Sequence, residues 1–233
     1  MAARLKLSII IPVGPGETAW RGLLEDLADL EDTAELILVA VTGESPRDFV
    51  PADHGLRIPA HWREAAPGRA RQQNTGAAAA QGETLWFLHA DSRLDAAATN
   101  AALAFSGRAA LGYFDLEFDA DGPWLTRLNA LGARLRSRWL GLPFGDQGLL
   151  LPRRLFDAIG GFDESLDAGE DHALVWAARR AKIRLAPLGV ALRTSGRRYA
   201  EHGWMRTTLR HAGLTVTQAR RFARSSAATR DRP

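Results

Sequence analysis

The chain has 233 residues and a formal net charge of +3, enough for one large domain or two small ones with a sizeable buried core. It contains no Cys, which excludes disulfides and thiolate metal sites and favours a reducing compartment. No run approaches ~18 consecutive apolar residues, and no apolar leader with a cleavage site opens the sequence. We therefore expect a soluble, cytoplasmic protein.

The charge is spread unevenly along the chain. From Arg193 to the C-terminus there are ten Arg against Glu201 and Asp231, which gives +8 and leaves −5 for the preceding residues. Such a basic tail suits an anionic lipid or a phosphorylated ligand, although a solvated helix surface has the same composition. We expect no nucleic-acid partner.

The first 92 residues have the pattern of a nucleotide-binding half-sheet. Apolar runs of strand length alternate with segments of helical spacing, which requires parallel strands and right-handed crossovers. The predicted elements are a strand over 5–12, a helix over 17–30, a strand over 34–42, a short strand near 56–58, a helix over 68–80 and a strand over 84–91.

For the sequence after residue 92 we predict an acceptor half over 93–200 and a basic C-terminal helix and tail over 201–233. Together with the first 92 residues they would form a single domain of 1–233. An amphipathic helix over 124–139 is expected to turn Arg127, Arg134, Arg136 and Arg138 to solvent. The other predicted elements are helices over 96–105, near Leu155, over 170–182 and over 204–223, and strands over 113–118, 149–151, 183–188 and 190–194.

The strand over 84–91 runs into His89 and Asp91. Because side chains alternate along a strand, the two would share one side and could hold a divalent cation. Open α/β sheets bind ligands beyond the carboxyl ends of their strands, which suits this position. The alternative is a surface His and an Asp that merely opens the next loop.

Arg69 and Arg71 stand at the start of the helix over 68–80, with Asn74 one turn later. The helix macrodipole disfavours cations at this end and favours anions. Two guanidiniums and free backbone N–H groups would therefore hold a diphosphate there, unless the helix start is simply solvated.

Glu170 and Asp171 open the helix over 170–182. Asp167 and Glu170 have the spacing of a capping box, which is sufficient to explain Glu170. Asp171 needs another reason, and its place at a helix start after a flexible Ala-Gly suits a catalytic base.

Two further loops carry candidate ligand contacts. Asp146 and Gln147 lie between two glycines, where they could meet acceptor hydroxyls or form an ordinary turn. Arg198 follows Gly196 and could close over a diphosphate or belong to the basic tail. By contrast, Gly14-Pro15-Gly16 matches a dinucleotide-binding fingerprint only in letters, because Pro15 lacks a donor and Glu17 would repel a pyrophosphate.

These motifs together resemble the family 2 glycosyltransferases of GT-A fold, and most closely the bacterial "transferase 2" subgroup associated with radical-SAM or selenium-related gene clusters. The matching segments cover nearly the whole chain in order: Ile9 to Pro12, Gly68 to Glu83, Phe87 to Ser92, Gly145 to Leu150, Gly160 to Glu164, Glu170-Asp171 and Arg197 to Arg210.

The resemblance implies a GT-A fold, an α/β class with a mostly parallel central sheet flanked by helices and a C-terminal helix, and an inverting transfer of a sugar from a nucleoside diphosphate. Asp91, with His89 in place of the family's first Asp, would bind Mn²⁺ or Mg²⁺. Asp171 would be the general base, with Glu170 beside it. The donor would be contacted by Pro12, Glu17, Glu44, Arg69, Arg71, Asn74 and Arg198, and the acceptor by Asp146 and Gln147.

Two departures from the family leave alternatives open. The usual polar Asn after the first strand is replaced by Val13-Gly14-Pro15-Gly16. The usual Asp-rich turn for the nucleotide base is replaced by Thr42-Gly43-Glu44-Ser45-Pro46. Either Glu44 substitutes, or the donor differs, or donor binding is impaired. A non-catalytic nucleotide-sugar-binding or regulatory protein is therefore the alternative. A sugar-phosphate nucleotidyltransferase fits less well, because Val13 to Thr18 lacks the cation that such an enzyme needs.

The C-terminal helix also has two interpretations. Packing against the core is preferred, while its mixture of Trp204, Met205 and Leu209 with Arg206 and Arg210 suits an interfacial helix at the inner face of the membrane. The second interpretation would fit a lipid-linked acceptor. The sequence leaves the acceptor, the sugar and the oligomeric state open.

Overall fold

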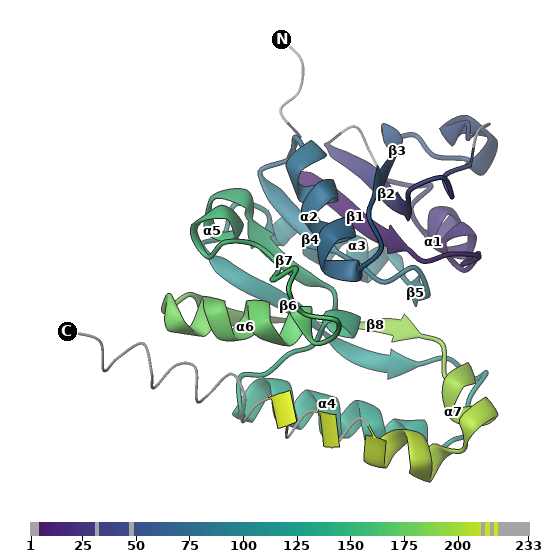
Figure 1. Cartoon of the computed structure of the whole chain (residues 1–233), viewed down its shortest axis with the longest axis vertical. Coiled ribbons are helices and arrows are strands. Elements are labelled where there is room, and N and C mark those ends of the chain that lie inside the picture. Colours follow the sequence, from purple (N-terminus) through teal and green to yellow (C-terminus); the bar gives the residue numbers. More distant parts are fainter. Residues whose placement is uncertain (1–4, 31–32, 47–48, 211–212, 215–216, 219–233) are drawn as a thin grey trace.

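A computed structural model describes residues 5–30, 33–46, 49–210, 213–214 and 217–218. Within these residues the strands are β1 (Leu7–Val13), β2 (Ala34–Val41), β3 (Ala60–Ala65), β4 (Thr84–Phe87), β5 (Ser92–Arg93), β6 (Ala110–Phe118), β7 (Leu149–Pro152) and β8 (Arg184–Thr194). They form one sheet in the order β3-β2-β1-β4-β7-β6-β8-β5 (Figure 1). The helices are α1 (Trp20–Asp26), α2 (Arg69–Ala79), α3 (Ala96–Phe105), α4 (Thr126–Trp139), α5 (Arg153–Ala158), α6 (Glu170–Arg180) and α7 (Arg197–His202), with short 3₁₀ turns η1 (Pro51–His54) and η2 (Gly145–Gln147).

The first four strands of this order are parallel, as expected for the nucleotide-binding half. β1 pairs with β2 and with β4, and β2 pairs with β3. Beyond β4 the sheet is mixed, because β7 is antiparallel to both β4 and β6 whereas β6 and β8 are parallel. The chain adds β2 and β3 on one side of β1 and then returns to add β4 on the other. This switch opens a crevice at the carboxyl ends of β1 and β4.

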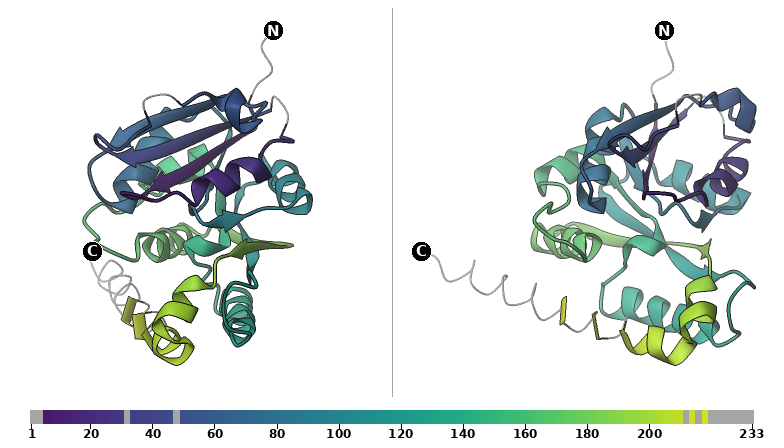
Figure 2. Two further views of the ribbon diagram at one scale, coloured as in Figure 1. Left: turned by 90° about the vertical axis from the view of Figure 1, so that its right-hand side faces the viewer. Right: turned by 45° about the vertical axis from the view of Figure 1, so that its right-hand side comes forward.

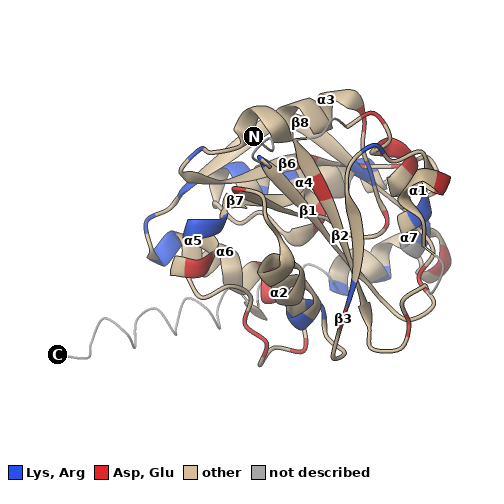
Figure 3. Ribbon diagram, turned by 90° about the horizontal axis from the view of Figure 1, so that it is seen from above, with Lys and Arg blue, Asp and Glu red and all other residues tan. Residues whose placement is uncertain are grey.

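Alternation along β1 builds two apolar layers. Ile9 and Ile11 face α1 and α3, while Ile10 faces α2 and its neighbours α5 and α6, and all three isoleucines are fully buried. The sheet therefore carries helices on both surfaces (Figure 2). Lys, Arg, Asp and Glu gather around the rim of the molecule (Figure 3).

Several predicted boundaries were wrong. The short strand lies at 60–65 instead of 56–58, because Leu56 and Ile58 are buried without joining the sheet. β4 ends at Phe87, so His89 and Asp91 lie in the following loop. The two strands expected on either side of Gly189 are one strand, β8, whose pairing with β6 shifts register between Tyr113 and Asp115. An irregularity of this kind lets a strand pass through a residue with positive φ, here Gly189 at 78°.

The orientation expected for α4 is confirmed for Arg127, Arg134 and Arg138, which are exposed, and is wrong for Arg136. Its buried residues are Thr126, Ala133 and Ser137, whereas Leu128, Leu131 and Leu135 are exposed. Arg136, expected in solvent, turns inward and donates hydrogen bonds to the carbonyl of Leu142 and the side chain of Gln147.

Residues 204–210, the described beginning of the predicted C-terminal helix, are helical and lie beside α4 (Figures 1 and 2). The Trp204 indole N–H donates to Asn129 Oδ1 at 2.6 Å, and Asn129 Nδ2 donates to Thr208 Oγ1 at 3.0 Å. Most of the predicted segment after 210 falls outside the described residues. Throughout the described ranges, no helix combines the length and apolarity needed to cross a bilayer.

Candidate active site

The carboxylate of Asp171 is fixed at the beginning of α6. Its Oδ2 accepts a 2.6 Å hydrogen bond from the N–H of Gly145, and its Oδ1 accepts one of 2.8 Å from the N–H of His172. The capping box expected from Asp167 does not form, because α6 begins after Gly169, whose φ is 86°, without a side-chain cap. The first turn of α6 is therefore held by contacts with the site itself.

Glu170 bonds to α2 instead of capping its own helix. Its buried carboxylate lies 2.5 Å from Arg69 Nε, and Arg69 Nη1 lies 3.1 Å from His89 Nε2. The structure thus brings together residues from α2, from the loop after β4 and from the start of α6.

Gly145 closes this group from the side of η2. A Cβ atom at this position would lie 2.8 Å from Asp171 Oδ2 and 2.9 Å from His89 Nε2, closer than such contacts normally permit. Only Gly allows the backbone to approach both side chains. Asp171 and His89 therefore meet at the Gly145 backbone, and Arg69 joins them through His89 and pairs with Glu170. We call Arg69, His89, Glu170 and Asp171 the Gly145 cluster.

Charge interactions set the protonation states in this cluster. Burial by itself would raise the pKa of Asp171, but the Arg69 charge, the Gly145 N–H and His89 outweigh it and lower the pKa. Burial disfavours the charged form of Arg69, yet Glu170 and Asp171 raise its pKa. At neutral pH the cluster therefore contains an ionised carboxylate that can accept a proton and a guanidinium that can stabilise an anion.

Asp146 in η2 has a different environment. Burial, opposed by Arg136 and reinforced by the charges of Asp171 and Asp91, raises its pKa to about 6. Among the described residues, its Oδ1 is buried without a hydrogen-bond partner. Asp91 and Asp146 are thus close enough to repel each other, and one of their oxygens is unsatisfied.

These two carboxylates bear on the expected metal. No group of three or more His, Asp or Glu side chains able to hold an ion occurs within the described ranges. Mg²⁺ and Mn²⁺ sites of transferases commonly use one or two carboxylates and complete their coordination with water and substrate phosphates. A cation between Asp91 and Asp146 would relieve their mutual repulsion and give Asp146 Oδ1 a partner. His89, which contacts Arg69, belongs to the same region.

Gln147 is a structural member of η2. Its Oε1 accepts hydrogen bonds from Ser137 Oγ at 2.7 Å and from Arg136, and its Nε2 donates to the carbonyl of Phe114 at 2.8 Å. Beside it, the Arg136 guanidinium lies over the Phe144 ring at 3.6 Å. This role of Arg136 was not predictable from the sequence pattern, because the contact joins α4 to η2 and depends on which side of α4 is buried.

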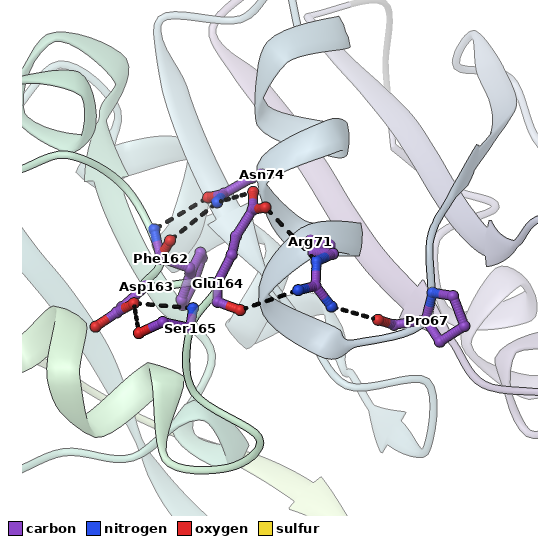
Figure 4. A network of polar contacts seen from close by, with 7 residues as sticks. All are labelled: Pro67, Arg71, Asn74, Phe162, Asp163, Glu164 and Ser165. Atoms are coloured by element: carbon purple, nitrogen blue, oxygen red, sulfur yellow. Dashed lines mark hydrogen bonds and ion pairs between the residues drawn. The ribbon is translucent and has the colours of Figure 1, made fainter.

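Arg71 and Asn74 contact the loop over 160–166 (Figure 4). The Asn74 amide donates to the Phe162 carbonyl and accepts from the Phe162 N–H, at 2.9 and 3.0 Å, and it also donates to Glu164. Arg71 donates to the carbonyls of Pro67 and Glu164. Of the two guanidiniums expected at the diphosphate, Arg69 lies in the Gly145 cluster and Arg71 holds this loop.

A cavity of about 150 Å³ lies beyond the carboxyl ends of β1 and β2. Both Glu17 and Glu44 line it, next to the last residue of β1, Val13, which follows Pro12. Glu17 Oε1 accepts the N–H groups of Thr18 and Ala19. Trp20, Arg21 and Trp62 also line this cavity.

Two residues of β3 were not predicted to belong to this region. Trp62 forms a wall of the cavity and meets Trp20 edge to face at 5.2 Å. Glu64 accepts hydrogen bonds from the Gly43 N–H and the Ser45 hydroxyl, which lower its pKa and hold the turn over 42–45 in place. A strand predicted at 56–58 could not have revealed either contact.

Two other residues complete the description of the site. Tyr199 in α7 is buried, and burial together with Asp146 raises its pKa to about 12. Arg198 precedes it in α7, and its side chain lies outside what the structure describes, so its predicted contact with the donor stays a prediction.

No protein-family profile and no curated protein matches this chain in sequence. Solved structures do match. S. aureus TarS in complex with UDP-GlcNAc superposes with a TM-score of 0.62 at 18% identity over 82% of this chain and 58% of that one. The mannosyltransferase PcManGT from Pyrobaculum calidifontis, in complex with GDP-Man and Mn²⁺, gives a TM-score of 0.58 at 18% identity, over 82% and 57%.

The chain has a GT-A fold. Its mixed sheet of eight strands, flanked by helices, is shared with these glycosyltransferases, and the expected fold is confirmed. This chain corresponds to less than two thirds of the length of either neighbour. In the GT-A fold of this chain, the Gly145 cluster and the cavity beside β1 both lie beyond the carboxyl ends of strands in the central sheet.

Proposed function

We propose that this protein is an inverting glycosyltransferase that moves a sugar from a nucleoside diphosphate to an acceptor hydroxyl. The observation that carries the proposal is the position of Asp171, an ionised carboxylate held by the Gly145 N–H within a cluster that also contains Arg69. The motifs support membership of family 2 and of its radical-SAM- or selenium-associated subgroup.

The donor would lie across the switch between β1 and β4. The cavity lined by Glu17, Glu44 and Trp62 would receive the nucleoside, since an aromatic wall suits a base and two carboxylates can accept hydroxyl or amino hydrogens. Two structural neighbours were crystallised with UDP-GlcNAc and with GDP-Man, which supports a nucleoside diphosphate sugar as the donor class.

Residues of the Gly145 cluster would perform the transfer. Asp171 takes the proton of the acceptor hydroxyl as that oxygen attacks the anomeric carbon. The bond from this carbon to the diphosphate breaks on the opposite side, which inverts the configuration. Arg69 neutralises charge on the departing diphosphate, and Glu170 positions Arg69 through the 2.5 Å ion pair.

Asp91 and Asp146, with His89, would hold a divalent cation, which would supply further stabilisation of the leaving diphosphate. In the mannosyltransferase neighbour the metal is Mn²⁺. In this proposal Asp146 contacts the acceptor, whereas Gln147, which is fully buried and bonded to Ser137, Arg136 and Phe114, supports Asp146 from within η2. We propose that the protein acts in the cytoplasm, at or near the inner face of the membrane.

The direct experiment incubates the full chain with a panel of nucleoside diphosphate sugars, Mn²⁺ or Mg²⁺ and candidate acceptors, and measures nucleoside diphosphate release. We expect release with at least one donor and its loss in EDTA. Calorimetric binding of a nucleotide without release across the panel would instead favour a non-catalytic binding protein, the alternative motivated by the altered turn over 42–45.

A further inference from the structure

Helix α4 presents a row of large apolar side chains to solvent. Leu128, Leu131, Leu135 and Trp139 follow one another at intervals of three or four residues, which places them on one side of the helix, and Trp124 stands four residues before Leu128 in the turn that leads into it. Trp124 is 72% exposed and Trp139 is 82% exposed. Single exposed apolar residues are ordinary, but a contiguous row marks an interaction surface.

The opposite side of α4 fixes this orientation. Ser137 Oγ donates to Gln147 Oε1, Arg136 bonds to the same oxygen, and Ala133 is buried against the body of the molecule. Rotation of the leucines inward would break these bonds. The exposed row is therefore a property of the folded structure.

Residues 204–210 lie beside α4 and expose two further large apolar side chains. Asn129 of α4 binds both Trp204 and Thr208, so the two helical segments lie alongside each other (Figure 2). Met205 and Leu209, one turn apart, are about two-thirds exposed. We call these two residues and the five of the row on α4 the apolar platform.

The two segments that carry the platform are basic, and Asp121 and Glu201 lie just before them. The sequence over 123–145 contains four Arg and no Asp or Glu, and the sequence over 202–218 contains two Arg and no Asp or Glu. Of these six, Arg127, Arg206 and Arg210 are exposed, while Arg134 and Arg138 share the single carboxylate of Asp115. The platform is therefore set in a positively charged surface.

We propose that the apolar platform docks this protein onto an anionic lipid surface. An interfacial helix has Trp and Leu on one side and Arg at its margins, so that the apolar side chains enter the acyl boundary and the guanidiniums meet lipid phosphates. α4 has both features, with Trp139 as its last residue and Trp124 two residues before its first, and its length of ~20 Å suits a helix lying flat on a bilayer. A second copy of the chain would bring like charges together, which disfavours self-association.

The test is co-sedimentation with vesicles of phosphatidylcholine alone and of phosphatidylcholine mixed with phosphatidylglycerol. We expect binding to the mixed vesicles at low salt, weaker binding at high salt and little binding to phosphatidylcholine alone. The triple variant Leu128→Ser, Leu131→Ser, Leu135→Ser should bind at least about tenfold more weakly. Val50→Ser removes an equally exposed apolar side chain elsewhere and should bind like the wild type.

Other outcomes would overturn the proposal. One is wild-type protein that stays in solution with the mixed vesicles at low salt. Another is a triple variant that binds unchanged, since the basic C-terminal residues alone would then explain binding. A third is a dimer in light scattering that the triple variant abolishes, since the platform would then join two copies.

A charge-reversal variant tests the role of the arginines, and the assay itself is independent of catalysis. Arg127→Glu with Arg206→Glu keeps the platform intact and should also weaken binding to the mixed vesicles, because these exposed charges would meet lipid phosphates. The assay needs no donor or acceptor, so its failure would leave the proposed transfer reaction untouched.

Discussion

At the scale of single residues, Asp171 carries the proposed chemistry. Asp171→Asn keeps the shape and the hydrogen bond from Gly145 but removes the proton acceptor. We expect kcat to fall by about 10²–10⁴-fold with little change in donor binding. Steady-state rates and calorimetry on the same preparation measure both quantities.

Asp163→Asn is the matched control for this substitution. Asp163 is an exposed carboxylate that accepts hydrogen bonds from the N–H and the hydroxyl of Ser165, and its variant should keep the wild-type rate. Wild-type turnover in the Asp171 variant would remove it as the base.

His172, next to Asp171, gives stability a defined pH dependence. It is fully buried, its Nε2 accepts a hydrogen bond from Trp176 Nε1 at 3.2 Å, and burial is the main cause that lowers its pKa. The unfolded chain therefore binds a proton at His172 more readily than the folded one below about pH 6.5. The contribution of His172 to the free energy of unfolding is complete above that pH and declines as pH falls.

Denaturant unfolding at a series of pH values between about 8 and 5 measures this decline. His172→Gln should flatten the acid side of the curve, whereas His61→Gln, at an exposed position on β3, should leave its shape unchanged. Curves of equal slope for His172→Gln and the wild type would contradict the assignment.

At the scale of elements, α2 holds the loop over 160–166 through the Asn74 amide as well as through Arg71. Asn74→Ala would leave the N–H and the carbonyl of Phe162 without their partners, at a cost of about 1–3 kcal/mol in the free energy of unfolding. Urea denaturation measures the loss. Thr75→Ala, one residue along the same helix, should change stability by less than about 0.5 kcal/mol, and an equal loss in both variants would show that the loop contact is unimportant.

Elements with strong local determinants were predictable from the sequence. The helix over 96–105 has the predicted bounds because Asp95 caps it, accepting the N–H of Ala98. α4 shows the limit of this approach. Its periodicity reveals an apolar and a basic side, but burial of Ser137 and Arg136 depends on Gln147, which the sequence pattern does not connect to α4.

At the scale of the whole molecule, Glu170 joins the two halves of the chain. Glu170→Ala would leave Arg69 of α2 without its partner from α6, and we expect a loss of about 1–3 kcal/mol in the free energy of unfolding together with lower activity. Glu201→Ala, which removes an exposed pair with Arg197, should cost less than about 1 kcal/mol. Thermal unfolding and rate measurements check both, and a silent Glu170 variant would contradict the link.

A bound donor product should also stabilise the whole molecule. A nucleoside diphosphate at 100 times its Kd, with Mn²⁺, should add ~2.7 kcal/mol to the free energy of unfolding and raise Tm by several degrees. A thermal-shift screen of nucleoside diphosphates with and without Mn²⁺ measures this. Identical melting points for every nucleotide would argue against the proposed donor class.

The composition of the site was partly predictable at this scale. Arg69, His89, Glu170 and Asp171 come from short motifs, each at the end of a predicted element, and parallel strands bring such ends to the same edge of a sheet. Trp62, Glu64, Arg136 and Tyr199 were missed, because their roles depend on the position of β3, the rotation of α4 and the packing of α7, which only long-range contacts determine.

Helix α4 lies between η2 on one side and the exposed leucine row on the other, so its thickness sets the distance between them. One side bonds to η2 through Ser137 and Gln147, and the other carries the leucine row. A helix with its side chains is ~10 Å across. If α4 rests on lipid head groups, Asp146 and Gln147 lie at about that height above them. A membrane-anchored acceptor would then need only a short spacer between its anchor and its reactive hydroxyl. Diffusion in the plane of the bilayer would bring this acceptor to the site.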